Sequence, residues 1–218
     1  MTIFPGSPIS PRLIKGALIG VDIFNPLASV VVFQYNPDTL TRRLEARAVS
    51  QEGERGEAMR LTGAPKETIT LSIEIDAADQ LEDGNPIGVT TGIHPTLAAL
   101  EMMLYPKAAS VILNDALSLV GTIEVIPVEG PMILFVWGPA RVLPVRLTSF
   151  SITEEAYDQI LNPIRAKVDL SLTVLSYQDL GQLSPGRALF LAHHIAKEVM
   201  ATLNVFNNVA SVGSGLKL

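Results

Sequence analysis

The sequence predicts a mainly β protein, an antiparallel barrel or strongly curled sandwich with one flanking helix and a C-terminal helix. The first observation is a strict two-residue repeat from Arg165 to Val174, in which polar and apolar side chains alternate. The second is the same alternation from Thr68 to Asp76. Such a repeat places one face of a strand on a core and the other on water or a polar partner. The third is that apolar residues recur at helical spacing in only two segments, His94–Tyr105 and Ser184–Asn204.

Three consecutive extended stretches between Pro131 and Tyr177 predict an antiparallel meander. The stretches are Met132–Trp137, Arg141–Ile152 and Arg165–Val174, and a polar span, Thr153–Pro163, precedes the last of them. Short connections favour antiparallel neighbours. We expect the edges of this meander to pair with other strands of the chain or with neighbouring copies, because an open sheet edge is rarely left bare.

The remaining segments predict further strands, loops and helices. Extended segments are expected in the first half because β-branched and aromatic residues gather between turn residues; they are Leu13–Asp22, Ser29–Tyr35, Thr39–Val49 and Thr68–Asp76. An amphipathic helix is the alternative for Thr39–Val49. Ser50–Arg60 and Ala77–Gly92 are expected to be loops, whereas Lys107–Glu129 stays ambiguous, with an apolar run at Val111–Val120 and a short strand as one option for Thr122–Val128.

These elements divide the chain into four parts. Residues 1–12 form an extended arm, residues 13–180 the β domain, residues 181–204 the C-terminal helix, and residues 205–218 a flexible tail. The helix carries an apolar stripe, for which packing against the core is the simplest interpretation and docking against a neighbouring subunit the alternative. The stripe consists of Leu189, Ala192, Ile195, Ala196, Val199 and Leu203.

The composition indicates a protein that buries surface against other chains. Apolar residues make up 48% of the chain and charged residues only 17%, a low charge density for a monomer in water. Polar residues, glycine or proline interrupt every apolar run, so no membrane span is expected. The net charge is −6 and no block of lysine and arginine residues occurs, so no direct binding to nucleic acid is predicted. The first 16 residues contain three prolines and no apolar core of a secretory signal, which predicts cytoplasmic assembly.

The residue patterns argue against an enzyme. The chain has no cysteine, and its adjacent His193 and His194 point about 100° apart on a helix, which does not favour one shared metal. Glu154 and Glu155 are adjacent in an extended stretch, where successive side chains face opposite ways and do not converge as a catalytic pair. No glycine-rich phosphate loop or nucleophile elbow occurs. We therefore expect no catalytic residues, no cofactor and no metal site.

Several segments, taken together, resemble the tube-domain family of contractile injection systems and phage tail baseplates. They are FQYNPDTLTRRLEAR (Phe33–Arg47), GAPKETITLSIEIDAAD (Gly63–Asp79), GIHPTLAALEMMLYP (Gly92–Pro106) and the long stretch Leu134–Leu180, which contains FVWGPARV and LNPIRA. They cover roughly half of the chain in the expected order. Many relatives carry a C-terminal LysM-type module that clamps the baseplate, and we expect this chain to lack it.

The resemblance implies a structural subunit that associates in a sixfold ring around a lumen and joins the trimeric spike or baseplate hub to the inner tube. A tube-capping or adaptor module elsewhere in the particle is the alternative function. The polar faces of the two alternating strands are candidates for the lumen wall or subunit contacts, with an ordinary solvent face as the alternative. These residues are Thr68, Thr70, Ser72, Glu74, Asp76, Arg165, Lys167, Asp169, Ser171 and Thr173. The loops Ser50–Arg60 and Ala77–Gly92 are candidate contacts between stacked layers.

Overall fold

A computed structural model describes residues 14–21, 29–47, 61–78, 86–105, 108–119 and 130–215. Its strands are β1 (Ala17–Val21), β2 (Ser29–Val32), β3 (Leu40–Glu45), β4 (Lys66–Asp76), β5 (Met132–Val136), β6 (Val142–Tyr157) and β7 (Pro163–Val174). Its helices are α2 (Pro86–Thr91), α3 (His94–Glu101), α4 (Ala108–Leu119) and α5 (Pro185–Gly215). The prediction of a mainly β protein with a few helices is confirmed.

All seven strands belong to one antiparallel sheet with the order β2-β1-β5-β6-β7-β4-β3. The predicted meander is confirmed, because β5, β6 and β7 are consecutive in the chain and adjacent in the sheet. The edges of the meander pair with other strands of the chain, the first of the two expected arrangements, with β4 beside β7 and β1 beside β5. The described strands do not close on themselves, so the barrel form of the expectation is replaced by an open sheet with edges at β2 and β3.

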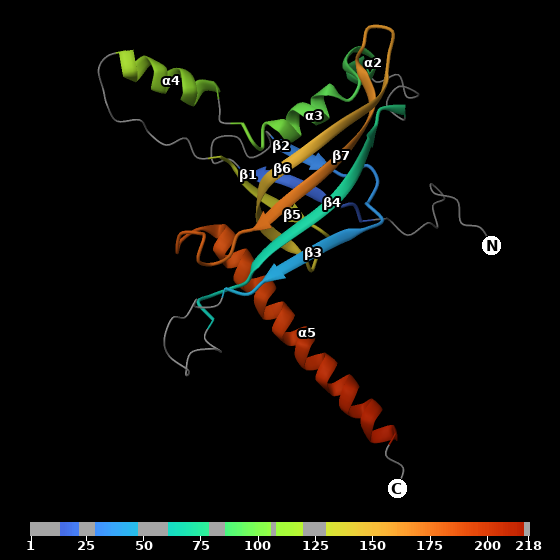
Figure 1. Ribbon diagram of the computed structural model, residues 1–218, viewed down its shortest axis with the longest axis vertical. Helices are drawn as coiled ribbons and strands as arrows, with labels where there is room; N and C mark the ends of the chain where they lie inside the picture. The colour runs from blue at the N-terminus through green and yellow to red at the C-terminus, as the bar shows by residue number, and fades with distance from the viewer. Residues whose placement is uncertain are drawn as a thin grey trace, which may run out of the picture.

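The core lies on one face of the long strands and is closed by the curl of the sheet. Apolar side chains of β4, β6 and β7 share one buried cluster with those of β1 and β5 and with Leu97 and Leu100 of α3. The segment after β2 reaches β4 across this core, since the Asp76 backbone N–H donates a hydrogen bond of 2.8 Å to Gln34 Oε1. Figure 1 shows β1, β2 and β5 behind the long strands. The strict alternation of β4 and β7 therefore separates a buried face from a polar one.

Gly92 and the β6–β7 turn attach the segment of α2 and α3 to the sheet at the end where β6 passes into β7. Gly92, between α2 and α3, has φ +55°, and a Cβ there would collide with the carbonyl oxygen of Pro163, so the position requires glycine. The Ile93 N–H donates to that same carbonyl oxygen at 2.9 Å. In the β6–β7 turn, Asn162 Nδ2 donates to the carbonyl oxygen of Thr90 at 3.0 Å.

Several elements differ from their predicted extents. β6 continues to Tyr157, through part of the span predicted as a polar connection, because register shifts near Ser149 and Ala156 keep it paired with β7. α2 occupies part of the expected loop Ala77–Gly92, and the ambiguous segment forms the helix α4. α3 ends at Glu101, before the predicted end at Tyr105. The C-terminal helix runs to Gly215, beyond the predicted end at Asn204 and through most of the expected tail. The arm 1–12, the loop Ser50–Arg60 and the optional strand Thr122–Val128 lie outside the described residues.

Candidate functional site

The two sets of polar residues singled out from the sequence lie side by side on one face of the sheet. The pairing of β4 with β7 places Thr68 opposite Thr173, Thr70 opposite Ser171, Ser72 opposite Asp169, Glu74 opposite Lys167 and Asp76 opposite Arg165. The register therefore joins all ten residues into a double row that faces away from the core. We call this double row the polar face. The sequence alone predicts the polar residues of each strand, but only the pairing register shows that the two sets lie on one surface.

Hydroxyl groups dominate the middle of the polar face. Neighbouring strands extend it, because Thr41 of β3 pairs with Thr70, and Ser149 and Ser151 of β6 pair with Ser171 and Asp169. A shallow depression of about 470 Å³ lies here; its polar lining consists of Thr39, Thr41, Thr70, Ser72, Ser149, Ser151, Asp169 and Ser171. The short hydroxyl side chains hold water by hydrogen bonds, and the Asp169 carboxylate adds one negative charge. This part of the sheet can therefore line an aqueous space.

Charges at the end of the polar face compensate one another. Asp76 and Arg165 form an ion pair in which both Nε and Nη2 of the arginine lie 2.8 Å from Asp76 Oδ2. The next pair along the ladder, Glu74 and Lys167, also places opposite charges on directly opposed residues, which favours this register. The polar face therefore combines neutral hydroxyls, two opposed pairs of charges and one carboxylate, Asp169, that lies opposite Ser72.

The strands that carry the polar face have open edges on both sides. β3 forms one edge of the sheet. On the other side, β5 pairs only with the first part of β6, from Val142 to Val145. Beyond Val145, β6 has β7 on one side and, within the described part of the chain, no strand on the other. Unpaired backbone N–H and C=O groups at such edges favour the addition of a further strand.

Two polar clusters that the sequence patterns did not predict fix the base of the β3–β4 hairpin. In the first, Glu67 is only 4% exposed, and its carboxylate contacts Arg42 at 2.6 Å and Lys197 of α5 at 3.3 Å. The available signal was its position, because alternation in β4 places residue 67 on the buried side together with Ile69 and Leu71. A charge at a position that alternation buries usually has a specific partner.

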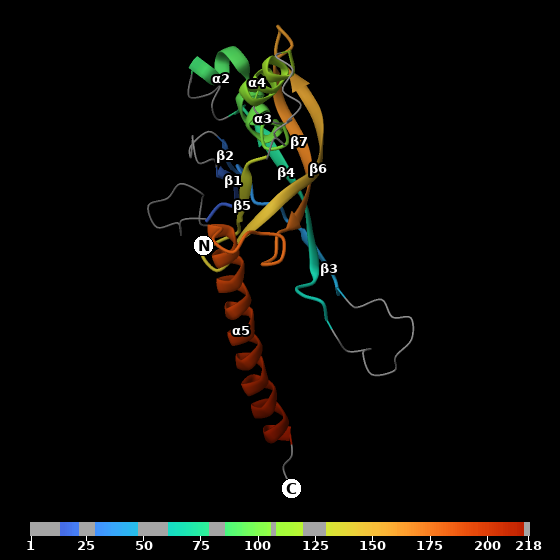
Figure 2. The ribbon, with the colours of Figure 1, turned by 90° about the vertical axis from the view of Figure 1, so that its left-hand side faces the viewer.

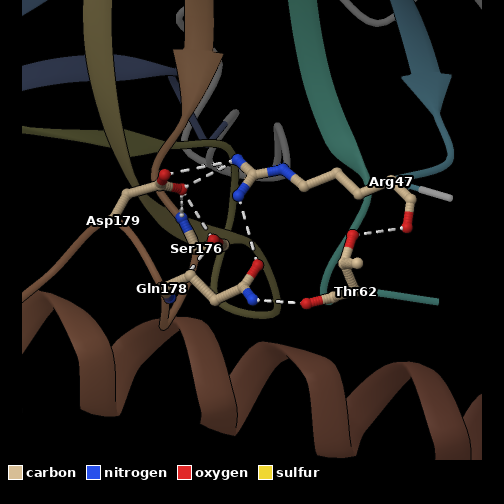
Figure 3. Close-up of polar contacts among 5 residues, drawn as sticks. All are labelled: Arg47, Thr62, Ser176, Gln178 and Asp179. Atoms are coloured by element: carbon tan, nitrogen blue, oxygen red, sulfur yellow. Dashed lines mark hydrogen bonds and ion pairs between the residues drawn. The ribbon is translucent and has the colours of Figure 1, made fainter. Parts of the chain in front are cut away.

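The second cluster joins residue 47 to the segment before α5 (Figure 3). Arg47 donates hydrogen bonds from Nη1 to Gln178 Oε1 at 3.1 Å and from Nη2 to Asp179 Oδ1 at 3.2 Å. Asp179 Oδ2 also accepts hydrogen bonds from the N–H and hydroxyl of Ser176 at 2.9 and 2.6 Å. Partial burial alone raises the pKa of Asp179, but the bonds from Ser176 and Arg47 outweigh it, so the pKa lies below its ordinary value.

The residues considered for catalysis do not converge. Glu154 and Glu155 are both exposed on β6, and no cluster of three or more metal-ligating side chains occurs among the described residues. His193 Nδ1 lies 3.3 Å from the carbonyl oxygen of Ala140, whereas His194 Nε2 lies 3.8 Å from Glu198 Oε1. Desolvation lowers the pKa of His193, and the charge of Lys197 lowers it further. The two histidines thus have different surroundings.

The apolar stripe of the C-terminal helix does not pack in the core. Phe190 is buried, but Ile195, Val199 and Leu203 of the predicted stripe are exposed. The simplest sequence interpretation of this stripe is therefore wrong. α5 contacts the sheet through its first turns and then extends away from it (Figure 2), which leaves most of the stripe uncovered. Among the described helices, none combines the length and apolar character that crossing a membrane requires.

Comparisons with known proteins leave the family open. No family model matches the chain, and no curated protein matches it. Among solved structures, a chain from the virion of a native gene transfer agent particle matches with a TM-score of 0.26 and 11% identity. The match covers 73% of this chain and 90% of that one. At this TM-score the likeness carries no argument about fold or function.

Proposed function

We propose that this chain is a structural subunit of a contractile injection system, a phage-tail-like particle. Its copies form a ring layer that joins the spike or baseplate hub to the inner tube. The observation that supports this proposal is the polar face on β4 and β7, continued on β3 and β6 and backed by the core. A continuous hydrated wall on one face is what a subunit that lines a channel needs. The segment resemblance supplies the kind of particle.

The two open edges beside the polar face support ring closure. When the free half of β6 in one copy pairs with β3 of the next, the polar faces become one continuous surface, and the two edges that flank the polar face are both covered. Such a contact joins two different surface patches, so repeated copies close into a ring when the rotation between them closes. The sixfold number comes from the resemblance.

The channel wall that we propose has a small net charge: its ten residues carry three carboxylates, on Glu74, Asp76 and Asp169, and two cations, on Lys167 and Arg165. Hydroxyls occupy its middle, and Glu74 and Asp76 stand opposite Lys167 and Arg165. Such a wall is expected to let hydrated material pass without strong electrostatic retention, because opposite charges at a few ångströms largely cancel at longer range.

Electron microscopy of the native particle tests the proposal. Particles from cells that produce a tagged copy of the full chain are expected to show a ring of density between spike and tube. The protein's absence from purified particles, or full-length sheathed tubes with a normal spike after its deletion, would refute the proposal. Density at the opposite end of the tube would favour the capping or adaptor alternative.

A further inference from the structure

α5 is held against the core side of the sheet by contacts that fix its direction. Gly186 in its first turn allows close packing, since a Cβ there would come within 2.7 Å of Met132 Sδ and 3.3 Å of Pro144. One turn before Lys197, His193 approaches the carbonyl oxygen of Ala140 in the β5–β6 turn. Lys197 then contacts Glu67 of β4. The helix thus passes from β5 and β6 to β4 across the side opposite the polar face.

The last contact directs α5 toward the open edge at β3. Glu67 binds Lys197 and also Arg42, which belongs to the edge strand β3 itself. Leu44 of β3 pairs with Glu67, so its side chain lies on the same side of the sheet as α5, and it is 51% exposed. Figures 1 and 2 both show α5 leaving the body at the end of the sheet where β3 lies and continuing beyond it.

The next two turns of the helix, residues 199 to 206, are mostly apolar and exposed. Residues 199 to 206, VMATLNVF, contain no charged side chain, and all of them are exposed. Phe206 is 71% exposed. Large exposed apolar patches on a soluble protein usually mark a contact with another molecule.

We propose that this free half of α5 is an intersubunit strap that packs on the outer side of the neighbouring copy joined at the β3 edge. The proposal rests on the proposed ring. The 18 residues from Glu198 to Gly215 make about 27 Å of helix at 1.5 Å per residue. The first strand of the neighbour lies only about 4.8 Å beyond β3. Even if the axis of this helix makes an angle of 60° with the direction from β3 to the neighbouring strand, the helix extends about 13 Å in that direction, past the boundary between the two copies.

The strap occupies the side of the wall away from the channel. The polar face needs water, whereas residues 199–206 need an apolar partner, and the sheet separates the two. The neighbouring copy therefore fits better than cargo inside the channel.

Site-specific photocrosslinking in the native particle tests the strap. A benzophenone amino acid replaces Leu203 on the apolar stripe or, as the matched control, Asn204, which lies about 100° round the helix. After irradiation, we expect a dimer of the chain from position 203, at least fivefold stronger than from position 204. Mass spectrometry of the crosslinked peptides should place the second residue in another copy, which a mixture of isotope-labelled and unlabelled chains distinguishes from a contact within one chain.

The outcomes separate the strap from the ring. Three outcomes would overturn the strap and leave the ring standing. They are a ring of density without a crosslink between copies, equal crosslinks from both positions, and a crosslink from position 203 to a different particle protein. Absence of the chain from the particle would overturn both.

Discussion

The Arg42–Glu67–Lys197 cluster allows a quantitative test of how α5 is attached to the sheet. Glu67 is nearly buried, whereas the side chains of Arg42 and Lys197 are 28% and 40% exposed. The loss of unfolding free energy is therefore expected to be largest when Arg42 is removed, because the buried Glu67 carboxylate then lacks its shorter contact. Arg42→Met removes the 2.6 Å contact and is expected to lower the free energy of unfolding by about 2–3 kcal/mol, below the range for a fully buried pair.

The other variants of this cluster have an expected order. Lys197→Met removes only the 3.3 Å contact of a more exposed side chain and should cost about 0.5–1 kcal/mol. In the double variant Arg42→Met/Glu67→Leu no carboxylate is left unpaired, so it should regain at least about 1 kcal/mol over Arg42→Met alone. Arg43→Met, whose ion pair with Glu45 is largely exposed, is the control and should stay within about 0.5 kcal/mol of the unmodified protein.

Urea unfolding measures these differences with two signals. The single tryptophan, Trp137, stacks on Phe135 at 5.8 Å between ring centroids and reports on the core, while circular dichroism at 222 nm reports on the helices. If α5 detaches first in Arg42→Met, the dichroism transition precedes the tryptophan transition. A loss in Arg42→Met no larger than in Arg43→Met would refute the inference that Glu67 needs this partner.

Three further predictions concern other parts of the molecule. Gly92→Ala should lower the free energy of unfolding by at least about 2 kcal/mol, since it combines a positive φ with a collision, whereas Gly181→Ala, which has open space around it, should leave the thermal midpoint nearly unchanged. The pKa of Asp179 is lower in the folded protein than its ordinary value of 3.8. The ionised carboxylate therefore stabilises the fold at pH values above 3.8, and this contribution is lost as the pH falls through the folded pKa. Asp179→Asn should flatten the fall of the urea midpoint below about pH 4. Leu170→Asp places a charge where the side chain is 2% exposed and should unfold the protein, while the exposed Lys167→Glu should stay folded by circular dichroism and alter only assembly. Equal loss of solubility in these last two variants would show that the faces of β7 are assigned wrongly.

The strands with clean alternation were predictable because one period decides both conformation and burial. β4 and β7 alternate without interruption, and the structure places their faces as expected. The end of β6 was not predictable in this way. Its register shifts break the period, and pairing with β7 keeps residues Thr153–Tyr157 extended although their sequence is polar.

The C-terminal helix shows the limit of a sequence pattern more clearly. Helical spacing of apolar residues indicates that one side needs a partner, but it does not say whether that partner lies within the chain. Phe190 packs against Tyr177, with 6.0 Å between ring centroids, whereas Leu203 is 51% exposed. Lys197 of α5 contacts Glu67 of β4, and this contact joins residues 130 positions apart.

By itself the sequence determined which faces of β4 and β7 are apolar, that the protein is mainly β, and that its charge density is low, because these are properties of local order and composition. Only the tertiary structure decided that the two polar rows share one face, that the sheet stays open at β3 and the end of β6, and that the apolar stripe of α5 points away from the core. Each of these depends on register or on a contact between distant residues, and the hydrophobic period of a single segment contains neither.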